Sequence, residues 1–532
     1  MSVPVRPAWR GAAEVVWLPT ADEMATLDRA ATAGGATTER ALIEAAGREV
    51  AHRIAARWPE GRVVAIAGRG HNGADALVAL RCLAAWGREV VAVQAGPTLP
   101  EPDVLAGWAL RMVGVEALPS LAANATVLID GILGTGLSGP PRDPQAAVIE
   151  AVIASGRPVV AVDGPSGADL STGAVAGACV RASLTVCLGW PKLGLLCYPA
   201  REFAGDIEAV EIGFPPPRES FGARAITARW VKAMLPARAP DAHKRDAGYL
   251  TLVAGREGMA GAAVLAARAA LRGGVGILRV VSDPRNREIL QRAVPGAIFV
   301  AWDDGSEVEA SIRWADAIAM GPGLGRQAAA RELVEAVFAL REERPIVLDA
   351  DGLSVWAGRA GDLADCLAGG DVVTPHPGEL GRVLDIPVPE VTADPRGQAR
   401  SAANRLGCAV LLKGAPSLLA RSGEPLRVAT LGGGALAAGG TGDVLTGLVG
   451  AGLAAGMEAM DAATAALFLS GLAAAESAEP VGHIAEDLPD RLPEARVAVS
   501  GLGAPVGGPV LFALEAAGRP VAQGPVGSAA RR

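Results

Sequence analysis

The chain has 532 residues, of which half are hydrophobic and only 4% aromatic, with 68 glycines and a formal net charge of −8. This length indicates two domains, and the abundance of small apolar residues is typical of α/β proteins. The acidic balance argues against nucleic acid or an anionic membrane as a general partner.

The spacing of the cysteines and the length of the apolar runs indicate the cellular compartment of the protein. The six cysteines form no CxxC pair and mostly lie in apolar runs, which indicates buried free thiols in a reducing environment. The first residues show no signal-peptide pattern, and no apolar run is long enough to cross a membrane. We therefore expect a cytoplasmic protein.

The first part of the chain predicts two helices and then a parallel sheet. Thr20, with Glu23 three residues later, is a cap-like start to helical apolar spacing, so two helices are expected before any strand. Short β-branched runs that end in loops of glycine and polar residues then alternate with helix-like segments, which is typical of βαβ units. These runs are residues 62–67, 126–130 and 158–163.

Polar side chains follow each of these three strands. Because the carboxyl ends of parallel strands share one edge, we expect Asn72, Asp75, Asp130, Asp163 and Ser166 to converge there. Oxygen-only ligands suit a hard cation, and the glycines of the GTGLSG stretch would present N–H groups to a phosphate. Each feature alone also fits a structural role, in which the aspartates cap the next helices. Three such loops together favour a binding site.

A second domain is predicted after a proline-rich stretch. Residues 215–240 are interpreted as a linker, because the sheet pattern resumes only at Tyr249. Residues 501–532 have few charges and scattered Gly and Pro, so we expect a partly disordered tail with no readable function. Between them, strand-then-polar-loop arrangements recur at residues 249–255, 277–281, 316–325, 345–353, 371–380 and 409–420.

The most informative stretch of the second domain is residues 432–456, where a glycine-rich loop runs into a helix. Thr441, Gly442 and Asp443 lie at the junction, where unpaired N–H groups and the helix dipole favour an anion such as a phosphate. A carboxylate beside a bound phosphate is repelled unless it has a task, and the usual task is to take a proton from an attacking hydroxyl. The alternative is that Asp443 merely caps the helix.

Two further residues of this domain are candidates for ligand contacts. Lys413 at a strand end is a plausible phosphate contact. His376 lies between two prolines, and we expect it to contact a substrate, although a lone histidine is more often structural.

The segments TADEMATLDRAA, GRGHNGAD, DGILGTGLSG, DGPSG and GWPKLGLL resemble the epimerase domain of bifunctional NAD(P)H-hydrate repair enzymes, over residues 14–214. The resemblance implies a Rossmann-like three-layer α/β/α domain that interconverts the R and S forms of hydrated NADH and NADPH, with Asp163 as a catalytic, substrate-contacting residue. It implies a potassium ion held by Asn72, Asp130 and Ser166. The other implied dinucleotide contacts are His71, Asn72, Gly73, Ala74, Asp75, Gly134, Thr135, Gly136, Leu137, Ser138, Gly139 and Pro140.

One stretch departs from the family pattern. The family usually shows NNGGDG where this chain has His71 to Ala76. Methyl groups at Ala74 and Ala76 would crowd a phosphate that needs close approach to the backbone. The alternative for this half is therefore a regulatory metabolite-binding module that has lost catalysis.

The motifs GPGLG, LDADGL, TPHPGEL, LLKGAP and GGTGD, in this order, are similar to those of ADP/ATP-dependent NAD(P)H-hydrate dehydratases, over residues 228–500. The resemblance implies a ribokinase-like α/β fold that dehydrates the S hydrate to NAD(P)H with ADP or ATP as the phosphate donor, giving AMP or ADP and phosphate. Implied substrate contacts are Ala262, Gly323, His376 and Asp443, and implied nucleotide contacts are Lys413, Gly414, Ala415, Pro416, Ser417 and Gly442.

The dehydration that the resemblance implies for the second domain follows a coherent chemical sequence. Hydroxide is a poor leaving group, so Asp443 would deprotonate the hydroxyl of the hydrate for attack on the terminal phosphate, and phosphate would then leave. Magnesium is expected with the nucleotide because phosphoryl transfer generally needs it. We expect small-molecule partners only, no nucleic acid or membrane, and a homo-oligomer. The alternative is a small-molecule kinase of the ribokinase superfamily with a regulatory first domain.

Overall fold

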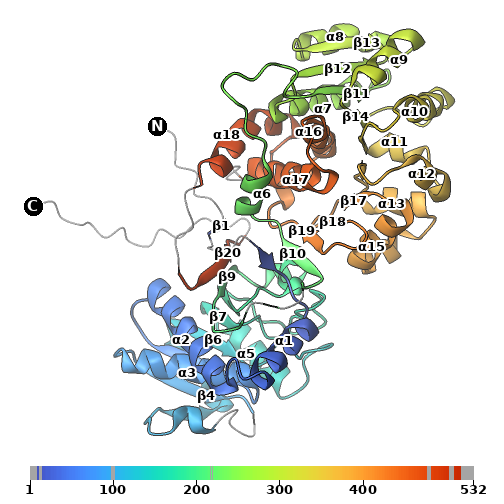
Figure 1. The fold of residues 1–532 in the computed structure, drawn as a ribbon. Coiled ribbons are helices and arrows are strands. Elements are labelled where there is room, and N and C mark those ends of the chain that lie inside the picture. Colours follow the sequence, from blue (N-terminus) through green and yellow to red (C-terminus); the bar gives the residue numbers. More distant parts are fainter. Residues whose placement is uncertain are drawn as a thin grey trace, which may run out of the picture.

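The computed structural model describes residues 9–10, 15–96, 102–215, 217, 220–475, 481–502 and 508–516. Within these residues the chain forms two lobes, each built around one β-sheet (Figure 1). The fold is therefore α/β with two domains, as the sequence predicts.

The first sheet has nine strands within the described residues, in the order β1-β20-β9-β8-β7-β6-β3-β4-β5. The run from β9 to β5 is parallel, and β20 and β1 extend it with antiparallel pairs. The strands are β1 (Trp9–Arg10), β3 (Val63–Ala67), β4 (Val90–Gln94), β5 (Met112–Gly114), β6 (Val127–Gly131), β7 (Val159–Val162), β8 (Leu184–Leu188), β9 (Asp206–Val210) and β20 (Val510–Leu514).

Helices cover both faces of this sheet, which gives the predicted three layers. Leu42 and Val50 of α2 and Leu77 of α3 pack in one core cluster, whereas Leu118 of α4 and Ile149 of α5 pack in another. The central strands β3, β6 and β7 are buried along their whole length, because both of their faces are covered. The helices are α1 (Ala21–Ala33), α2 (Glu39–Arg57), α3 (His71–Ala85), α4 (Leu118–Ala123) and α5 (Gln145–Ala154).

The second sheet has eleven strands within the described residues, in the order β13-β12-β11-β14-β15-β16-β17-β18-β19-β10-β2. It is parallel from β13 to β17, and β18 turns back antiparallel to β17. The strands are β2 (Val16–Trp17), β10 (Ala223–Ala225), β11 (Tyr249–Val253), β12 (Ile277–Ser282), β13 (Ala297–Ala301), β14 (Ala317–Met320), β15 (Ile346–Leu348), β16 (Val372–Val373), β17 (Ala409–Leu412), β18 (Leu418–Ala420) and β19 (Leu426–Val428).

This sheet also lies between two helical layers. Helices α7, α16, α17 and α18 share one core cluster with the strands, and α9, α10, α12, α13 and α15 share the other. The helices are α6 (Ala228–Met234), α7 (Ala260–Gly273), α8 (Arg287–Ala293), α9 (Gly305–Trp314), α10 (Ala328–Leu340), α11 (Ala350–Ser354), α12 (Ala360–Cys366), α13 (Pro377–Leu384), α14 (Val388–Ala393), α15 (Pro395–Leu406), α16 (Thr441–Ala454), α17 (Ala459–Ala475) and α18 (Leu488–Ser500).

The two ends of the chain are exchanged between the sheets. Strand β2, near the amino end, pairs with β10 of the second sheet, and β20, near the carboxyl end, pairs with β9 of the first. The expectation that two helices precede any strand is wrong, because β1 and β2 come before α1. The stretch interpreted as a linker also contains a strand, β10, and a whole helix, α6.

The carboxyl-terminal segment is fixed to the first domain by side chains as well as by strand pairing. Arg201 Nη2 donates to Glu515 O at 2.7 Å, and Ala516 N donates to Asp206 Oδ1 at 2.8 Å. Residues 508–516 of the expected partly disordered tail thus belong to the first sheet and its flanking contacts, and residues 503–507 and 517–532 lie outside the described residues.

Three smaller sequence predictions are tested by the fold. Thr20 and Glu23 form the predicted capping box at the start of α1. All six cysteines are free, and five of them are buried. Among the described residues, no helix is both long enough and apolar enough to cross a membrane.

Shortening Phe512 to alanine should destabilise the first domain. Its ring is 4% exposed and packs in the core beneath β20, so we expect a loss of about 3 kcal/mol in the free energy of unfolding of that domain. Chemical denaturation followed by circular dichroism measures it. Val497→Ala, at a site 70% exposed, serves as the control and should change little. Equal effects of the two substitutions would contradict the role of β20.

Candidate functional sites

The first candidate site lies at the carboxyl ends of β3, β6 and β7. Asn72, in the first turn of α3, donates from Nδ2 to Val162 O at 2.6 Å and more weakly to Leu133 O at 3.4 Å. Ser166 lies on the other side of the same segment, where its Oγ accepts from Leu133 N at 2.8 Å. The loops after β3, β6 and β7 therefore meet, as parallel topology requires.

Asp130 and Ser166 form a buried pair within this site. Ser166 donates from Oγ to Asp130 Oδ1 at 2.6 Å and from its backbone N–H to Oδ2 at 2.8 Å. Burial raises the pKa of Asp130 to about 6, and the hydrogen bonds from Ser166 oppose that rise. Asp130 does not cap a helix, so the helix-capping alternative does not apply to it; its oxygens accept from Ser166 and from Ile132 N instead.

The glycine-rich loop approaches the start of α3. A side chain at Gly134 would lie 2.6 Å from Asn72 Oδ1, so only glycine allows this close approach. The residues from Thr135 to Pro140 are half-buried or exposed, where they are open to a ligand. His71 begins α3 with an exposed ring whose Nε2 lies 2.6 Å from Glu39.

The altered 71–76 stretch does not crowd this site as expected. It forms the first turns of α3, and Ala74 and Ala76 are both fully buried in the core against the sheet. Their methyl groups pack inward, so the departure from the family pattern leaves the face of the helix start open.

Asp163 follows β7 directly and carries a feature that sequence reasoning missed. Its carboxylate forms an ion pair with Lys192, whose side chain is 1% exposed. A lysine inside the otherwise apolar GWPKLGLL stretch is the signal that could have found it.

The second candidate site is built around Asp443. It is the third residue of α16, and the N-cap residue is Gly440, with a φ of +92° and no side-chain cap. The capping alternative for Asp443 is therefore excluded. Burial raises the pKa of Asp443 to about 7, and the negative charge of Asp349 adds to the effect while Lys413 opposes it.

Lys413 connects the carboxylates of this site. Its Nζ donates to Asp349 Oδ1 at 2.6 Å and lies 3.7 Å from Glu379 Oε2. Thr446 of α16 donates to the other oxygen of Asp349 at 2.8 Å. Burial works against the charge of Lys413, but the two carboxylates outweigh it and raise the pKa of the ammonium group. Sequence reasoning assigned no role to Asp349, Glu379 or Thr446.

The proposed nucleotide contacts lie around the same ammonium group. A side chain at Gly442 would lie 3.4 Å from Lys413 Nζ, so the start of α16 and the end of β17 are adjacent. After Lys413 the chain turns tightly, with Ser417 Oγ donating to Gly414 O at 3.0 Å. The turn and the helix start together form a concave arrangement of N–H groups and one cation, which suits a phosphate.

His376 has a structural contact as well as its place beside the site. It is the N-cap of α13, where its Nδ1 accepts from Gly378 N at 3.0 Å, and Glu379 completes a capping box. Since Nδ1 accepts, the neutral ring carries its proton on Nε2. Burial lowers the pKa of His376, so the ring is neutral at pH 7.

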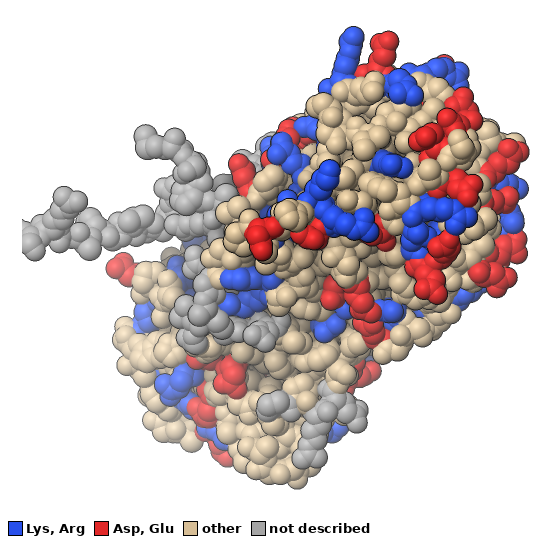
Figure 2. Space-filling model, turned by 45° about the horizontal axis from the view of Figure 1, so that its top comes forward, with Lys and Arg blue, Asp and Glu red and all other residues tan. Residues whose placement is uncertain are grey.

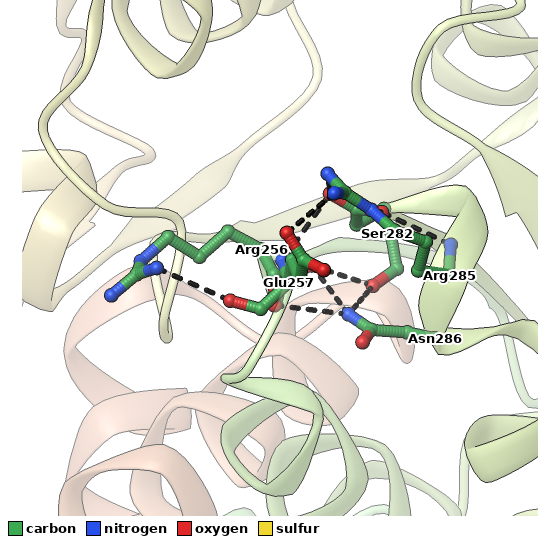
Figure 3. A network of polar contacts seen from close by, with 7 residues as sticks. Arg256, Glu257, Ser282, Arg285 and Asn286 are labelled. Atoms are coloured by element: carbon green, nitrogen blue, oxygen red, sulfur yellow. Dashed lines mark hydrogen bonds and ion pairs between the residues drawn. The ribbon is translucent and has the colours of Figure 1, made fainter.

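A polar network fixes the loop between β11 and α7 (Figure 3). Asn286 donates from Nδ2 to Gly255 O at 2.9 Å and to Arg256 O at 3.1 Å, and Ser282 donates to Gly255 O at 2.8 Å. Arg285 is bonded to Asp283 and Glu257, and the guanidinium of Arg256 donates from Nη1 to Glu257 O at 3.2 Å (Figure 3).

The same loop brings two predicted substrate contacts together. Arg256 N donates to Gly323 O at 2.7 Å, and a side chain at Gly323 would lie 3.1 Å from the methyl group of Ala262. Ala262 and Gly323 therefore form one small-residue surface beside α7.

Charge is distributed differently on the surface and in the sites. Acidic and basic side chains are interspersed on the face shown in Figure 2, whereas each site contains an ammonium–carboxylate pair that is buried in the first site and partly buried in the second. Within the described part of the chain, no group of three or more His, Cys, Asp or Glu side chains has metal-binding geometry.

Two family models match the chain. Residues 39–194 match the YjeF-related protein N-terminus, and residues 250–495 match NAD(P)H-hydrate dehydratase. The matched ranges contain the first and second candidate sites respectively.

Related proteins match this chain over most of its length. A bifunctional NAD(P)H-hydrate repair enzyme of Coxiella burnetii is 32% identical over 89% of this chain and 97% of its own, and one of Escherichia coli is 33% identical over 81% and 84%. An ADP/ATP-dependent NAD(P)H-hydrate dehydratase of Bacillus subtilis, co-crystallised with ATP and Mg²⁺, aligns with 51% of this chain and 97% of its own at 30% identity, with a TM-score of 0.46.

Two α/β domains, each with a buried carboxylate cluster at the carboxyl ends of its parallel strands, define a two-site α/β enzyme. The chain belongs to the family of bifunctional NAD(P)H-hydrate repair enzymes.

The pKa of Asp443 is open to direct measurement. Asp349→Asn removes a neighbouring negative charge and releases Lys413, so the pKa of Asp443 should fall by about one pH unit from about 7. Carbon-13 NMR of labelled aspartate side chains, compared with an Asp443→Asn spectrum for assignment, gives the value. Asp490→Asn, on the outer helix α18, should leave the pKa of Asp443 unchanged. An equal pKa in the Asp349 variant would contradict the electrostatic coupling.

Proposed function

We propose that the first site interconverts the R and S hydrates of NADH and NADPH and that the second site dehydrates the S hydrate with ADP or ATP. The observation that carries the proposal is the Asp443 carboxyl, which lies at a helix start beside the Lys413 ammonium group and has a pKa of about 7. A general base with a pKa near the working pH is effective, because it is ionised and still basic.

At the second site, Asp443 takes the proton of the substrate hydroxyl as that oxygen attacks the terminal phosphate of the nucleotide. Lys413 and the N–H groups at the start of α16 hold the phosphate that is transferred. The phosphate then leaves from the ring carbon as the nitrogen lone pair forms a carbon–nitrogen double bond, and loss of a proton from the neighbouring ring carbon gives the carbon–carbon double bond of NAD(P)H. Ala262, Gly323 and His376 line the side on which the hydrate would lie, and the turn from Lys413 to Ser417 would hold the nucleotide.

At the first site, the hydrated ring would contact Asp163, and the start of α3 and the 134–140 loop would hold the phosphates of the dinucleotide. The inward packing of Ala74 and Ala76 supports an active epimerase over a purely regulatory domain. Epimerisation would supply the second site with the S form, which explains the fusion of the two domains.

Two cations belong to the proposal. Asn72, Asp130 and Ser166 offer amide, carboxylate and hydroxyl oxygens around one backbone segment, which fits a potassium ion. Magnesium would arrive on the phosphates of the nucleotide, because the described residues contain no cluster that would hold it alone, and it would neutralise phosphate charge. The cytoplasmic location, supported by six free cysteines, and a homo-oligomeric state complete the proposal.

A mixture of R and S hydrates tests both activities at once. With ADP or ATP, magnesium and potassium, the wild type should restore the absorbance of reduced nicotinamide completely. Asp443→Asn should lower the rate at least about 1,000-fold, because the hydroxyl loses its base, while binding of the hydrate persists. Asp163→Ala should stop recovery at the S fraction. A stable phosphorylated product without absorbance recovery would instead support the kinase alternative.

Potassium should stabilise the first domain. Replacing tetramethylammonium chloride with potassium chloride at equal ionic strength should raise its unfolding temperature by about 3 °C, because an ion that binds only the folded state shifts the equilibrium. Differential scanning calorimetry measures the shift. Asn72→Leu removes one proposed oxygen ligand and should abolish it. An equal rise in that variant would show that potassium acts elsewhere.

A further inference from the structure

Lys192 is the largest fully buried side chain among the described residues. Burial of an ammonium group is unfavourable unless the charge is paired and hydrogen-bonded. The lysine lies in the loop after β8, beside the proposed epimerase site, and nothing in the sequence interpretation gave it a role. Its position therefore calls for a specific partner and a specific task.

The partner is one oxygen of Asp163. Lys192 Nζ donates to Asp163 Oδ1. It also donates to Leu188 O, at a distance of 3.1 Å. Leu188 N donates to the same Asp163 Oδ1 at 2.9 Å. Among the described residues, the hydrogen bonds to this carboxylate all fall on Oδ1. Oδ2 is thus left for a ligand, and its direction is fixed by the bonds to Oδ1.

The backbone of Asp163 is also held in an uncommon conformation. Its φ is +65°, in the left-handed region that side chains other than glycine seldom adopt. The bond from Asp163 N to Val186 O at 2.8 Å keeps the residue in place at the end of β7. Such strain persists where the surrounding structure fixes a functional side chain.

A second carboxyl group faces this pair. Asp75 of α3 is 4% exposed, and burial raises its pKa well above the ordinary range, while the charge of Asp163 adds to the rise and Lys192 opposes it. Asp28 of α1 and the thiol of Cys187 on β8, whose pKa burial also raises, are the other titratable groups of the cluster. A buried carboxyl beside a carboxylate that is paired with a lysine is an arrangement that can supply a proton to a bound ligand.

We propose that Lys192 is a positioning residue for epimerisation, which fixes Asp163 by Oδ1 so that Oδ2 faces the hydroxyl of the hydrated ring while Asp75 faces the ring nitrogen. The inference rests on the proposed function of the first domain. A hydroxyl on the carbon beside a ring nitrogen can open to an aldehyde. The hydroxyl proton passes to Asp163, the carbon–nitrogen bond breaks, its electron pair stays on nitrogen, and nitrogen takes the proton of Asp75. Closure on the other face reverses each transfer and gives the other epimer.

Lys192→Met in the full chain tests the inference. Epimerisation of the R hydrate should slow by about 100-fold through kcat with little change in KM, because the base is misplaced while the dinucleotide contacts remain. Dehydration of the S hydrate by the same preparation should be unchanged, which checks protein quality. Lys244→Met, at an exposed lysine, is the matched control and should leave both rates unchanged.

Further readouts separate positioning from a merely structural role. In Lys192→Met the acid limb of epimerisation should move to higher pH, because a buried carboxylate without its cation is protonated more readily. In Lys192→Ala, added propylammonium should restore part of the epimerisation rate. The double variant Lys192→Met/Asp163→Asn removes both charges, so its thermal unfolding shows whether the domain tolerates a neutral pair.

The experiments distinguish a failure of the positioning role of Lys192 from a failure of the proposed epimerase function. A folded Lys192→Met with the wild-type rate and pH profile would overturn the positioning role, as would a folded Lys192→Ala that propylammonium does not restore. If Lys192→Met does not fold, the Lys192→Ala experiment decides. A wild type that dehydrates the S hydrate but never epimerises the R form would count against the proposed function of the first domain instead.

Discussion

An ammonium–carboxylate pair lies at the centre of each site, buried in the first site and partly buried in the second. Lys192 pairs with Asp163 in the first domain, and Lys413 pairs with Asp349 in the second. Each pair is stable in a low-dielectric environment only because further hydrogen bonds hold it, from Leu188 in one case and from Thr446 in the other. The two halves thus use the same electrostatic arrangement on two different sheets.

A second carboxyl group with a raised pKa lies beside each pair. Asp75 and Asp443 each lie in a buried environment next to an already charged aspartate, and both have a raised pKa. The common cause is burial, and the neighbouring negative charge increases the effect. A site with one paired carboxylate and one carboxyl whose pKa is raised can hold and move protons without solvent, which is what both proposed reactions require.

The sequence predicted those parts of the sites that depend on local pattern. Asp130 and Asp163 lie at the ends of short apolar runs, so their convergence follows from parallel topology, and Asp443 follows a glycine-rich loop that indicates the start of α16. Lys192 and Asp349 were not assigned roles, because composition does not show which charged side chains are buried together. Strands β2 and β10 have two and three residues, too few for a periodic signal, and their pairing joins segments about 200 residues apart.

The exchange of end strands affects the order in which the two sheets can be completed during synthesis. A protein leaves the ribosome from its amino end, and domains commonly fold in that order. Here β9 of the first sheet receives its neighbour β20 from residues 510–514, whereas β2 reaches the second sheet from residues 16–17. The epimerase half therefore has an open sheet edge during synthesis, and that edge closes only after the dehydratase half has been made. A cut at the junction of the two halves would therefore remove a strand neighbour from each sheet, β20 from the first and β2 from the second.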